Sequence, residues 1–475
     1  MGSRKVTDWQ GKHVTVAGLG VSGIPAAKVL HARGAIVTVV NDGDDARARE
    51  QAAELEALGI PVRLGDGATL PEGTELIVTA PGWKPDKPLF VAAREAGVDV
   101  WGDVELAWRL RGPDAAPWLA ITGTNGKTTT TQMLASILKA AGLRTAAVGN
   151  IGVSLLDAVL GEEQYDVLAV ELSSYQLHWA PSLRAHSAAV LNLAPDHLDW
   201  HGSMEAYAAD KGRIYEGNRI ACVYNVDATD KPSTEDLVRE ADVEEGCRAI
   251  GFTLGAPGPS QLGVVDGILV DRAFVENRQK NAQELAEISD VNPPAPHNIA
   301  NALAAAALAR AFGVPPKAVR DGLRAFTPDA HRIAHVADVD GVAYVDDSKA
   351  TNTHAAEASL AAYESIVWIA GGLAKGASFD ELVAKSAKRL RAVVLIGADR
   401  ALIREALARH APEVPVVDLD RTDTGAMLQA VTEAKRLAQP GDTVLLAPAC
   451  ASMDMFTNYN KRGDAFAEAV RELGS

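Results

Sequence analysis

Short apolar runs alternate with longer amphipathic segments along most of the chain. In the first part, apolar runs occupy residues 14–18, 36–40, 76–80 and 98–101, and helical stretches separate them. Such runs indicate buried strands, and strands that alternate with helices form a mostly parallel sheet covered by helices. The segment up to residue 112 therefore predicts an α/β domain.

The same alternation returns twice. A strand at residues 118–121 precedes a helix over residues 128–140, which Gly142 ends, and further strands are predicted at residues 165–170 and 188–193. A third α/β unit begins near residue 328. Its predicted strands lie at residues 342–345, 366–370, 392–396, 414–417 and 443–447.

One stretch breaks this pattern. Residues 227–296 are polar and hold only short strand-like pieces, at residues 263–265 and 268–270, before an alanine-rich helix from His297 to about Phe312. A linker is predicted at residues 111–117. We therefore predict an α/β protein of three domains. These are an N-terminal Rossmann-like domain over residues 1–112, a central P-loop ATPase-like domain with a parallel sheet over residues 113–327, and a C-terminal Rossmann-like domain over residues 328–475.

Composition limits the partners and the cellular compartment that we expect for this protein. A net charge of −16 opposes nucleic-acid binding, because a large negative field repels phosphate backbones. The 3 cysteines are far apart and lack metal-ligand spacing, which argues against a disulfide framework and fits a reducing compartment. Residues 1–10 are polar, and no apolar run approaches the ~20 residues of a membrane-spanning helix. We expect a cytoplasmic protein that inserts into no membrane and binds no nucleic acid.

A glycine loop lies between the predicted strand and helix at the start of the central domain. In such loops, backbone N–H groups and a positive helix end face phosphates, a lysine reaches the β- and γ-phosphates, and a threonine ligates Mg²⁺. Lys127 and Thr128 take those two places, although Ile121 stands where the strict motif has its first glycine. An ordinary glycine turn would have no need of the Lys-Thr pair. ATP binding is therefore predicted for Gly123, Thr124, Asn125, Gly126, Lys127, Thr128 and Thr129.

The first domain carries a second glycine loop, Gly-Leu-Gly-Val-Ser-Gly at residues 18–23, directly after a predicted strand. Asn41 and Asp42 close the next strand. This spacing suits a dinucleotide whose ribose meets an acidic residue. A uridine nucleotide would use the same loop and the same acidic end, so the pattern leaves both ligands open.

Two predicted strands of the central domain end in groups that bind divalent metals. Glu171 directly follows one strand, and His197 follows the next as part of an Asp-His pair. Mg²⁺ needs few protein ligands, because it keeps several of its waters. The alternative makes Glu171 a helix-capping carboxylate and His197 a surface histidine. Beside a phosphate loop, a metal site is favoured.

Three further polar residues belong to predicted helices of the central domain. Lys211 lies in one of them, where a lysine is most often solvated. Asn298 and Asn301 are neighbours on the alanine-rich helix, because they are three residues apart. Their amides offer a donor and an acceptor, as the edge of adenine requires. N-capping explains Asn298 equally well, but not Asn301.

In the third unit, polar residues again lie around the predicted strands. His331 and Arg332 precede the first strand, and Asp-Asp-Ser-Lys-Ala-Thr-Asn at residues 346–352 follows it. Lys375 and Ser452 lie in loops after later strands. Chemistry in such sheets gathers beyond the carboxyl ends of the strands. These loops are either decoration or the site of a second anionic ligand that faces the nucleotide.

Taken in order, these motifs resemble the Mur ligase family, whose members extend the peptide of the bacterial cell-wall precursor. The resemblance covers all three units. It rests on the phosphate loop and on Glu-Leu-Ser-Ser at residues 171–174, Asp-His at 196–197, His-Asn-Ile-Ala-Asn at 297–301, His-Arg at 331–332 and Asp-Ser-Lys-Ala-Thr-Asn at 347–352. The last motif, Gly-Leu-Gly at residues 18–20 and Pro-Ala-Cys-Ala-Ser at residues 448–452 point to members that add D-glutamate.

The resemblance implies an ATP-dependent amide-bond ligase of peptidoglycan precursor synthesis. The implied substrates are UDP-N-acetylmuramoyl-L-alanine and D-glutamate, joined through an acyl phosphate, and we expect a monomer. The implied catalytic residues are Lys127, Glu171, His197 and Lys211. Mg²⁺, expected as a pair of ions, is implied at Thr128, Glu171, His197 and a Lys211 that CO₂ has carbamylated and so made carboxylate-like.

The resemblance also assigns binding roles. For ATP it implies Asn298 and Asn301 on adenine, with Arg332 and Asp347 on the ribose and phosphates. For the UDP-sugar substrate it implies Val21, Ser22, Asn41, Asp42, Asn150 and Ser173. For D-glutamate it implies Lys349, Thr351, Lys375, Ser452 and Tyr459. The chain departs from the family at residues 41–43, where relatives often have Asp-Thr-Arg and this chain lacks the expected cation, and at Tyr459, where phenylalanine is common.

Three other interpretations stay open. A sister Mur ligase or a folylpolyglutamate synthetase would add another amino acid, although the Asp-Asn-Pro-Arg motif used for diaminopimelate or lysine does not occur. An NAD-dependent dehydrogenase would use residues 18–23 and Asp42, but it leaves the Gly-Lys-Thr run unexplained. A nucleotide-binding regulator without activity has no need of the full set of catalytic residues.

Overall fold

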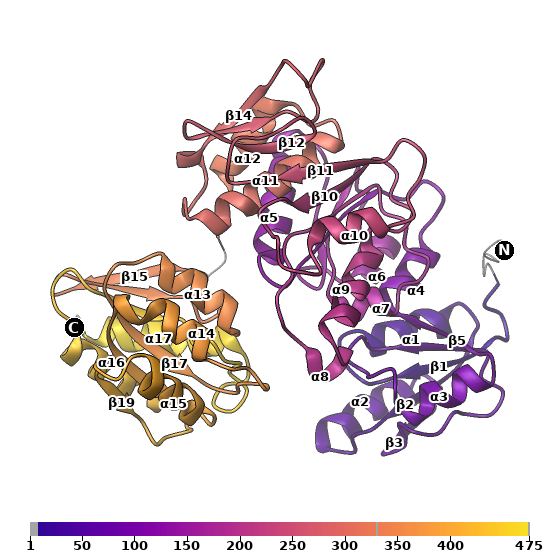
Figure 1. The fold of residues 1–475 in the computed structure, drawn as a ribbon. Coiled ribbons are helices and arrows are strands. Elements are labelled where there is room, and N and C mark those ends of the chain that lie inside the picture. The colour runs from indigo at the N-terminus through magenta and orange to yellow at the C-terminus, as the bar shows by residue number, and fades with distance from the viewer. Residues whose placement is uncertain (1–7, 329–330, 474–475) are drawn as a thin grey trace. The chain divides into compact units, whose positions relative to one another are not determined.

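The computed structural model describes residues 8–328 and 331–473. It divides into two compact units, Met1–Phe326 and Thr327–Ser475 (Figure 1). The first unit contains two sheets and the second contains one. Both are α/β, as the alternation of apolar runs predicted. Residues 1–7, which belong to the polar N-terminal stretch, lie outside the described residues. No helix within the described ranges is both long and apolar enough to cross a membrane.

A parallel sheet of order β3-β2-β1-β4-β5 forms the N-terminal part of the first unit. Its strands are β1 (His13–Ala17), β2 (Ile36–Asn41), β3 (Val62–Leu64), β4 (Leu76–Thr79) and β5 (Asp99–Gly102). Its helices are α1 (Gly23–Ala32), α2 (Ala46–Glu56), α3 (Pro88–Glu95) and α4 (Asp103–Leu110). The four predicted strands are confirmed. Strand β3 escaped prediction because it has only 3 residues and none is fully buried.

A larger sheet of order β14-β13-β12-β11-β10-β9-β6-β8-β7 forms the rest of the first unit. The strands from β6 to β12 pair in parallel, whereas β12, β13 and β14 pair antiparallel. The antiparallel edge is the polar stretch that resisted assignment from sequence. The strands are β6 (Trp118–Thr122), β7 (Ala147–Gly149), β8 (Leu168–Glu171), β9 (Ser187–Val190), β10 (Ala221–Asn225), β11 (Arg248–Phe252), β12 (Gln261–Val265), β13 (Ile268–Asp271) and β14 (Gln283–Glu287).

Helices cover this sheet and carry several of the polar side chains predicted for the site. They are α5 (Lys127–Ala140), α6 (Leu155–Leu160), α7 (Ser174–His178), α8 (Leu198–His201), α9 (Met204–Gly212), α10 (Thr234–Glu240), α11 (Pro296–Ala311) and α12 (Pro316–Ala325), with short 3-10 turns at Arg213–Tyr215 and Ile288–Asp290. Helix α11 is the predicted alanine-rich helix. Residues 302–309 of α11 are fully buried, because small side chains on every face let α5 and the sheet approach it closely.

The second unit holds a sheet of order β15-β16-β20-β17-β18-β19, in which only the edge strand β15 is antiparallel. Its strands are β15 (Ala334–Val339), β16 (Val342–Asp346), β17 (Ile366–Gly371), β18 (Leu390–Ile396), β19 (Val416–Asp418) and β20 (Thr443–Leu446). Its helices are α13 (Thr353–Ala361), α14 (Asp380–Ser386), α15 (Arg400–His410), α16 (Ala426–Leu437) and α17 (Tyr459–Leu473), with a 3-10 turn at Ala387–Arg389. The five predicted strands are confirmed, and β15 was missed because neither of its faces is fully buried.

The contact between α12 and α5 gives a test of this packing. A Cβ on Gly322 of α12 would lie 2.3 Å from the Ile137 backbone of α5. We expect Gly322→Ala to force the helices apart and to lower the free energy of unfolding by ~1–3 kcal/mol. Thermal unfolding followed by circular dichroism measures the loss. Gly112→Ala is the matched control, because a Cβ there meets nothing within 4 Å. Equal melting temperatures for the two variants would contradict the proposed close packing.

Candidate active site

The predicted glycine loop joins β6 to α5. Gly123 and Gly126 have φ angles of 157° and 81°, which are conformations that glycine adopts at little cost. A Cβ at Gly126 would lie 2.4 Å from Oδ1 of Asn301, so the loop passes directly under α11. Asn192, after β9, holds the loop from the other side: its Oδ1 accepts from the Asn125 backbone N–H at 2.8 Å. The strand–loop–helix arrangement that presents amides to phosphates is therefore present.

Two lysine side chains meet on one carbonyl of this loop. Lys127 Nζ and Lys211 Nζ each donate to the Gly123 carbonyl at 2.9 Å. Lys211 is 2% exposed and lies 4.6 Å from the ring centre of Tyr207. Burial, and then the positive charge of Lys127, lower the pKa of the Lys211 amine well below its usual range. The interpretation of Lys211 as a solvated surface lysine is therefore wrong, and burial shifts the equilibrium of this amine toward its neutral form.

Glu171 ends β8 beside this pair. It is 1% exposed, and its Oε1 accepts from the side-chain amide of Asn150 at 3.0 Å. Its Oε2 is buried and has no hydrogen-bond partner among the described residues. A buried carboxylate oxygen without a partner is costly unless a ligand meets it. Glu171 caps no helix, because Ser173 is the N-cap of α7. The capping alternative for Glu171 is therefore wrong.

His197 is the N-cap residue of α8 and has a φ angle of 53°. Its ring packs 4.8 Å from that of Tyr175, and its Nε2 lies 3.5 Å from Oδ2 of Asp196. The side chain is 34% exposed, so it is only partly a surface histidine. Thr128, at the start of α5, is buried. Within residues 8–328 and 331–473, no three His, Cys, Asp or Glu side chains gather in a cluster that could hold a metal ion.

A buried carboxylate that sequence reasoning missed lies directly before Lys211. Asp210 accepts hydrogen bonds from Nδ1 of His178 and Nδ1 of His201, each at 2.9 Å. Burial raises its pKa, but the hydrogen bonds from the two imidazoles and the charge of Arg213 outweigh burial and hold the pKa at about 2. The ionised acceptor thus joins α7, α8 and α9. No spacing signal could reveal it, since its partners come from separate helices.

The two asparagines of α11 are neighbours, as predicted. Asn301 Nδ2 lies 3.4 Å from Oδ1 of Asn298, and Asn298 Nδ2 donates to the Pro293 carbonyl at 3.2 Å. Ala295 is the N-cap of α11, so the N-capping explanation of Asn298 is wrong. Both amides are nearly buried beside the phosphate loop, where an adenine edge would meet them.

The predicted uridine contacts gather at the carboxyl ends of β1 and β2. Val21 is 89% exposed, and Asn41 Oδ1 accepts from the Leu19 backbone N–H at 3.1 Å. Asp42 forms an ion pair with Lys87, whose ammonium lies 4.7 Å from the ring centre of Trp83. Lys87 thus places a cation beside Asp42, whereas residues 41–43 themselves carry none. It escaped prediction because it comes from a distant loop.

Ser22 connects this first sheet to the central site. Its hydroxyl donates to Oδ2 of Asp103 at 2.9 Å, and burial raises the pKa of Asp103. Gln176 of α7 also bonds the Asp103 side chain, and it forms the capping box of α7 with Ser173. The hydroxyl of Ser173 is therefore engaged in that cap, close to the residues that meet Ser22. Asn150 bonds to Glu171, and Ser173 lies two residues after it, so both predicted substrate-binding residues lie near Glu171.

In the second unit, the residues after β16 form the centre of a separate cluster. Asp347 is buried and its carboxylate accepts from Ser359 and, at 3.3 Å, from the Ile333 backbone N–H. Burial raises the pKa of Asp347 to about 6, although Arg332 lies close enough to favour the ionised form. His331 donates to Asp346 at 2.6 Å, and this hydrogen bond raises the pKa of its imidazole.

The predicted D-glutamate contacts lie in the loops after β16, β17 and β20 and, for Tyr459, at the first residue of α17. Lys349 Nζ lies 5.3 Å from the ring centre of Tyr459. The loop of Ser452 pairs with the loop of Lys375, because Leu373 and Ala451 exchange two backbone hydrogen bonds of 2.9 and 3.0 Å. Thr351 is half-buried in the loop after β16. Arg462 belongs to the motifs that carry the family resemblance, although no role was predicted for it. It is 1% exposed and links the loops after β16 and β20 by donating to the carbonyls of Ser348 and Cys450.

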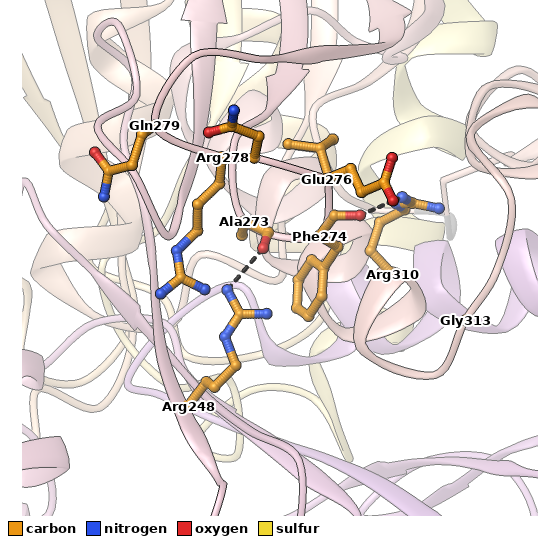
Figure 2. A pocket seen from close by; sticks show the side chains of 10 residues that line it. Arg248, Ala273, Phe274, Glu276, Arg278, Gln279, Arg310 and Gly313 are labelled. Atoms are coloured by element: carbon orange, nitrogen blue, oxygen red, sulfur yellow. Dashed lines mark hydrogen bonds between the residues drawn. The ribbon is translucent and has the colours of Figure 1, made fainter.

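A cavity of about 730 Å³ lies elsewhere, at the edge formed by residues 227–296 (Figure 2). Arg248 donates to the Ala273 carbonyl at 2.6 Å, and Arg310 donates to the Phe274 carbonyl at 3.1 Å. Arg310 also pairs with the buried Asp271. These guanidinium groups therefore hold the loop of residues 273–279, and the cavity contains none of the predicted catalytic groups.

Comparison with known proteins agrees with this geometry. The Mur ligase middle domain matches residues 121–309, and the Mur ligase glutamate ligase domain matches residues 331–450. A protein of Streptomyces avermitilis named UDP-N-acetylmuramoylalanine--D-glutamate ligase is 88% identical, over 99% of this chain and 100% of its own length. The chain belongs to the Mur ligase family. A protein of Streptomyces coelicolor with the same name is also 88% identical, again over 99% of this chain and 100% of its own length.

Solved Mur ligase structures share the fold. The UDP-N-acetylmuramate-alanine ligase of Thermotoga maritima has a TM-score of 0.56 at 20% identity and covers 97% of this chain and 99% of its own. The MurF ligase of Thermotoga maritima, solved with ADP, has a TM-score of 0.55 at 15% identity and covers 99% of this chain and 97% of its own. At these identities the likeness shows the α/β fold alone. The family predicted from the motifs is confirmed, and the names of the two relatives agree with the predicted amino acid, D-glutamate.

The raised pKa of Asp347 gives a test with a defined pH dependence. The unfolded carboxyl has a pKa of about 3.9, so the free energy of unfolding falls as the pH rises from about 3.9 to about 6, and above that pH the loss is constant at up to ~2–3 kcal/mol. We expect Asp347→Asn to raise the melting temperature of the second unit at about pH 7.5 and to leave it unchanged at about pH 4. The exposed Asp420→Asn is the control. A difference between wild type and Asp347→Asn that is the same at both pH values would contradict the buried-carboxylate explanation.

Proposed function

We propose that this chain is an ATP-dependent ligase that joins D-glutamate to UDP-N-acetylmuramoyl-L-alanine in peptidoglycan precursor synthesis. The observation that carries the proposal is the phosphate loop with Lys127 and the buried Lys211 on a single carbonyl, near a Glu171 carboxylate whose Oε2 has no hydrogen-bond partner among the described residues. The two relatives with 88% identity carry the name of this activity. Because the reaction consumes ATP, we expect it in the cytoplasm.

The proposed ATP site uses the central sheet and its first helix. The N–H groups of residues 123–129 and the positive end of α5 would face the phosphates, and Lys127 would reach the β- and γ-phosphates. Asn298 and Asn301 would bind adenine. Arg332 and Asp347 of the second unit would complete the ribose and phosphate contacts. A structural neighbour solved with ADP supports nucleotide binding by this fold.

The residues beside the loop fit Mg²⁺, proposed as a pair of ions. Thr128, Glu171 and His197 would offer two oxygens and one imidazole. Oε2 of Glu171 has no hydrogen-bond partner among the described residues, so this oxygen could ligate a cation. Bound Mg²⁺ would screen the negative charge of the phosphates and of the developing transition state. Glu171 is the one anionic ligand of these three residues, and a modified Lys211 would supply a second.

Carbamylation of Lys211 by CO₂ is the proposed modification. The reaction needs a neutral amine as nucleophile, and burial beside Lys127 lowers the pKa of this amine in the required direction. The carbamate would replace a second buried cation by an anion next to Lys127. It would thus remove the repulsion between two ammonium groups and provide an oxygen ligand for Mg²⁺.

The chemistry must activate a carboxylate, which is a poor electrophile in water. The terminal carboxylate of the UDP-muramoyl substrate would attack the γ-phosphate of ATP, break its β–γ bond and release ADP. The neutral amine of D-glutamate would then attack the acyl phosphate, form the amide and release phosphate and a proton. Lys127 would hold the transferring phosphoryl group against charge repulsion. Much of the acceleration would come from the positioning of the anionic substrates.

The two remaining substrates have candidate sites at opposite ends of the chain. We propose that Val21, Ser22, Asn41 and Asp42, now joined by Lys87, bind uridine diphosphate, and that Asn150 and Ser173 face the sugar and the peptide. For D-glutamate we propose Lys349, Thr351, Lys375, Ser452 and Tyr459. The proposed domains are a Rossmann-like domain of residues 1–112, a P-loop domain of residues 113–327 and a Rossmann-like domain of residues 328–475, working as a monomer.

Phosphate release in the presence of ATP, Mg²⁺ and UDP-N-acetylmuramoyl-L-alanine tests this proposal. With a panel of single amino acids, we expect release with D-glutamate to exceed that with any other amino acid, L-glutamate included, by at least ~10-fold. Lys127→Ala should fold and lower this rate by ~100-fold or more. Preference for another amino acid would favour a sister ligase. A rate for Lys127→Ala within ~10-fold of wild type would refute the assignment of Lys127.

The proposed carbamate predicts chemical rescue. Lys211→Ala should lose at least ~100-fold of the D-glutamate-dependent rate, because a metal ligand is gone. Added acetate should restore part of the rate, since a small carboxylate can occupy the space left by the carbamate. Lys139→Ala, an exposed lysine of α5, is the control and should respond to neither change. Activity of Lys211→Ala that does not depend on the added anion would argue against the carbamate.

A further inference from the structure

Three of the four residues proposed to hold Mg²⁺, all except Thr128 of α5, lie in or next to short helices that contact one buried carboxylate. Glu171 lies directly before the first turn of α7, His197 is the N-cap of α8, and Lys211 lies in α9. Helices of this length have little stability of their own. Their mutual placement therefore depends on side-chain contacts, and the contacts converge on Asp210.

Asp210 is 6% exposed and uses both of its carboxylate oxygens. His178, the last residue of α7, donates from Nδ1 to the carboxylate at 2.9 Å. His201, the last residue of α8, donates from Nδ1 to Oδ2 at 2.9 Å, and Arg213 donates to Oδ1 at 3.1 Å. One anion thus holds the ends of α7 and α8 against α9.

His201 also links Asp210 to the start of α7 and, through the ring of Tyr175, to His197. The side chain of His201 is fully buried, and its Nε2 lies 3.0 Å from the hydroxyl of Ser174, the first residue of α7. The centre of the Tyr175 ring lies 4.8 Å from the centre of the His197 ring and 5.6 Å from that of the His201 ring. A shift of His201 would therefore move both the segment after Glu171 and the ring of His197.

We propose that Asp210 is a positioning residue, which through His178 and His201 holds Glu171, His197 and Lys211 in the arrangement that a shared metal site requires. This inference rests on the proposed function. Its physical basis is that ligands of a metal must be fixed by the hydrogen bonds behind them, and loss of such bonds typically costs ~10–100-fold in metal affinity or activity.

Asp210→Asn tests the inference, because it keeps the shape of the side chain but cannot accept from both imidazoles and Arg213. We expect kcat to fall ~10–100-fold and the Mg²⁺ concentration for half-maximal rate to rise ~10-fold, while KM for ATP and D-glutamate stays within ~3-fold. Asp271→Asn is the matched control. Asp271 is fully buried, pairs with Arg310 and accepts two backbone N–H bonds, but it lies on β13. That variant should lose stability and keep wild-type kcat and Mg²⁺ dependence.

A second readout does not depend on activity. In buffer with ¹³C-labelled bicarbonate and no nucleotide, the carbamate of Lys211 should give a ¹³C signal in wild type and in Asp271→Asn, and a much weaker one in Asp210→Asn. Two substitutions of the partly exposed His178, one that keeps an N–H donor and one that removes it, test the hydrogen bond to Asp210. His178→Asn keeps an N–H donor toward Asp210 and should retain most of the rate that His178→Leu loses.

The outcomes separate this inference from the proposed function. Asp210→Asn with wild-type kcat and Mg²⁺ dependence, or with an undiminished carbamate signal, overturns the positioning role. An inactive wild type that still shows the signal, with loss in Asp210→Asn, sinks the proposed function and supports the positioning role. A wild type with neither activity nor signal overturns both.

Discussion

The burial of the Lys211 amine beside Lys127 is the interaction on which the central site depends. Two ammonium groups on one carbonyl would repel each other, and neither could be hydrated fully. The fold meets this cost in two ways: the pKa of Lys211 falls, and the carboxylates of Glu171, Asp196 and Asp210 lie close enough to favour its charged form. Such balance makes Lys211 chemically unlike the other lysines of the chain.

The sheet topology explains why these groups can meet. Strands β6, β8 and β9 are adjacent and parallel, so the phosphate loop, Glu171 and the segment before His197 all leave the same edge of the sheet. Helix α11 approaches the same edge from far along the sequence, and only glycine at position 126 lets Asn301 come so near. The alanine-rich surface of α11 serves this approach, because larger side chains would hold the helix away from α5.

At Asp347, the stability of the fold and the proposed binding of ATP favour different side chains. A buried carboxylate with a pKa of about 6 is an unfavourable choice for folding at neutral pH, and an amide of the same shape would avoid the cost. The proposed contact with ATP accounts for its presence. Asp271 and Asp210 differ from Asp347, since several donors satisfy each of them. Asp271 of β13 accepts from the backbone N–H groups of Ala273 and Phe274 and pairs with Arg310 of α11.

The sequence by itself determined the α/β class, most strands, the phosphate loop and the family, because apolar periodicity and glycine-bearing motifs are local properties of the chain. It also predicted the neighbouring amides of α11 from helical spacing. It marked the strand-like pieces at residues 263–265 and 268–270, which are β12 and β13, but it left this antiparallel edge unassigned. It missed β14 and β15, since strands at an edge bury too little to show a pattern. Tertiary structure decided everything that joins distant segments: Lys87 on Asp42, two lysines on the Gly123 carbonyl, and Asp210 between His178 and His201. Burial and shared hydrogen bonds arise only when the segments pack together, so no reading along the chain could find them.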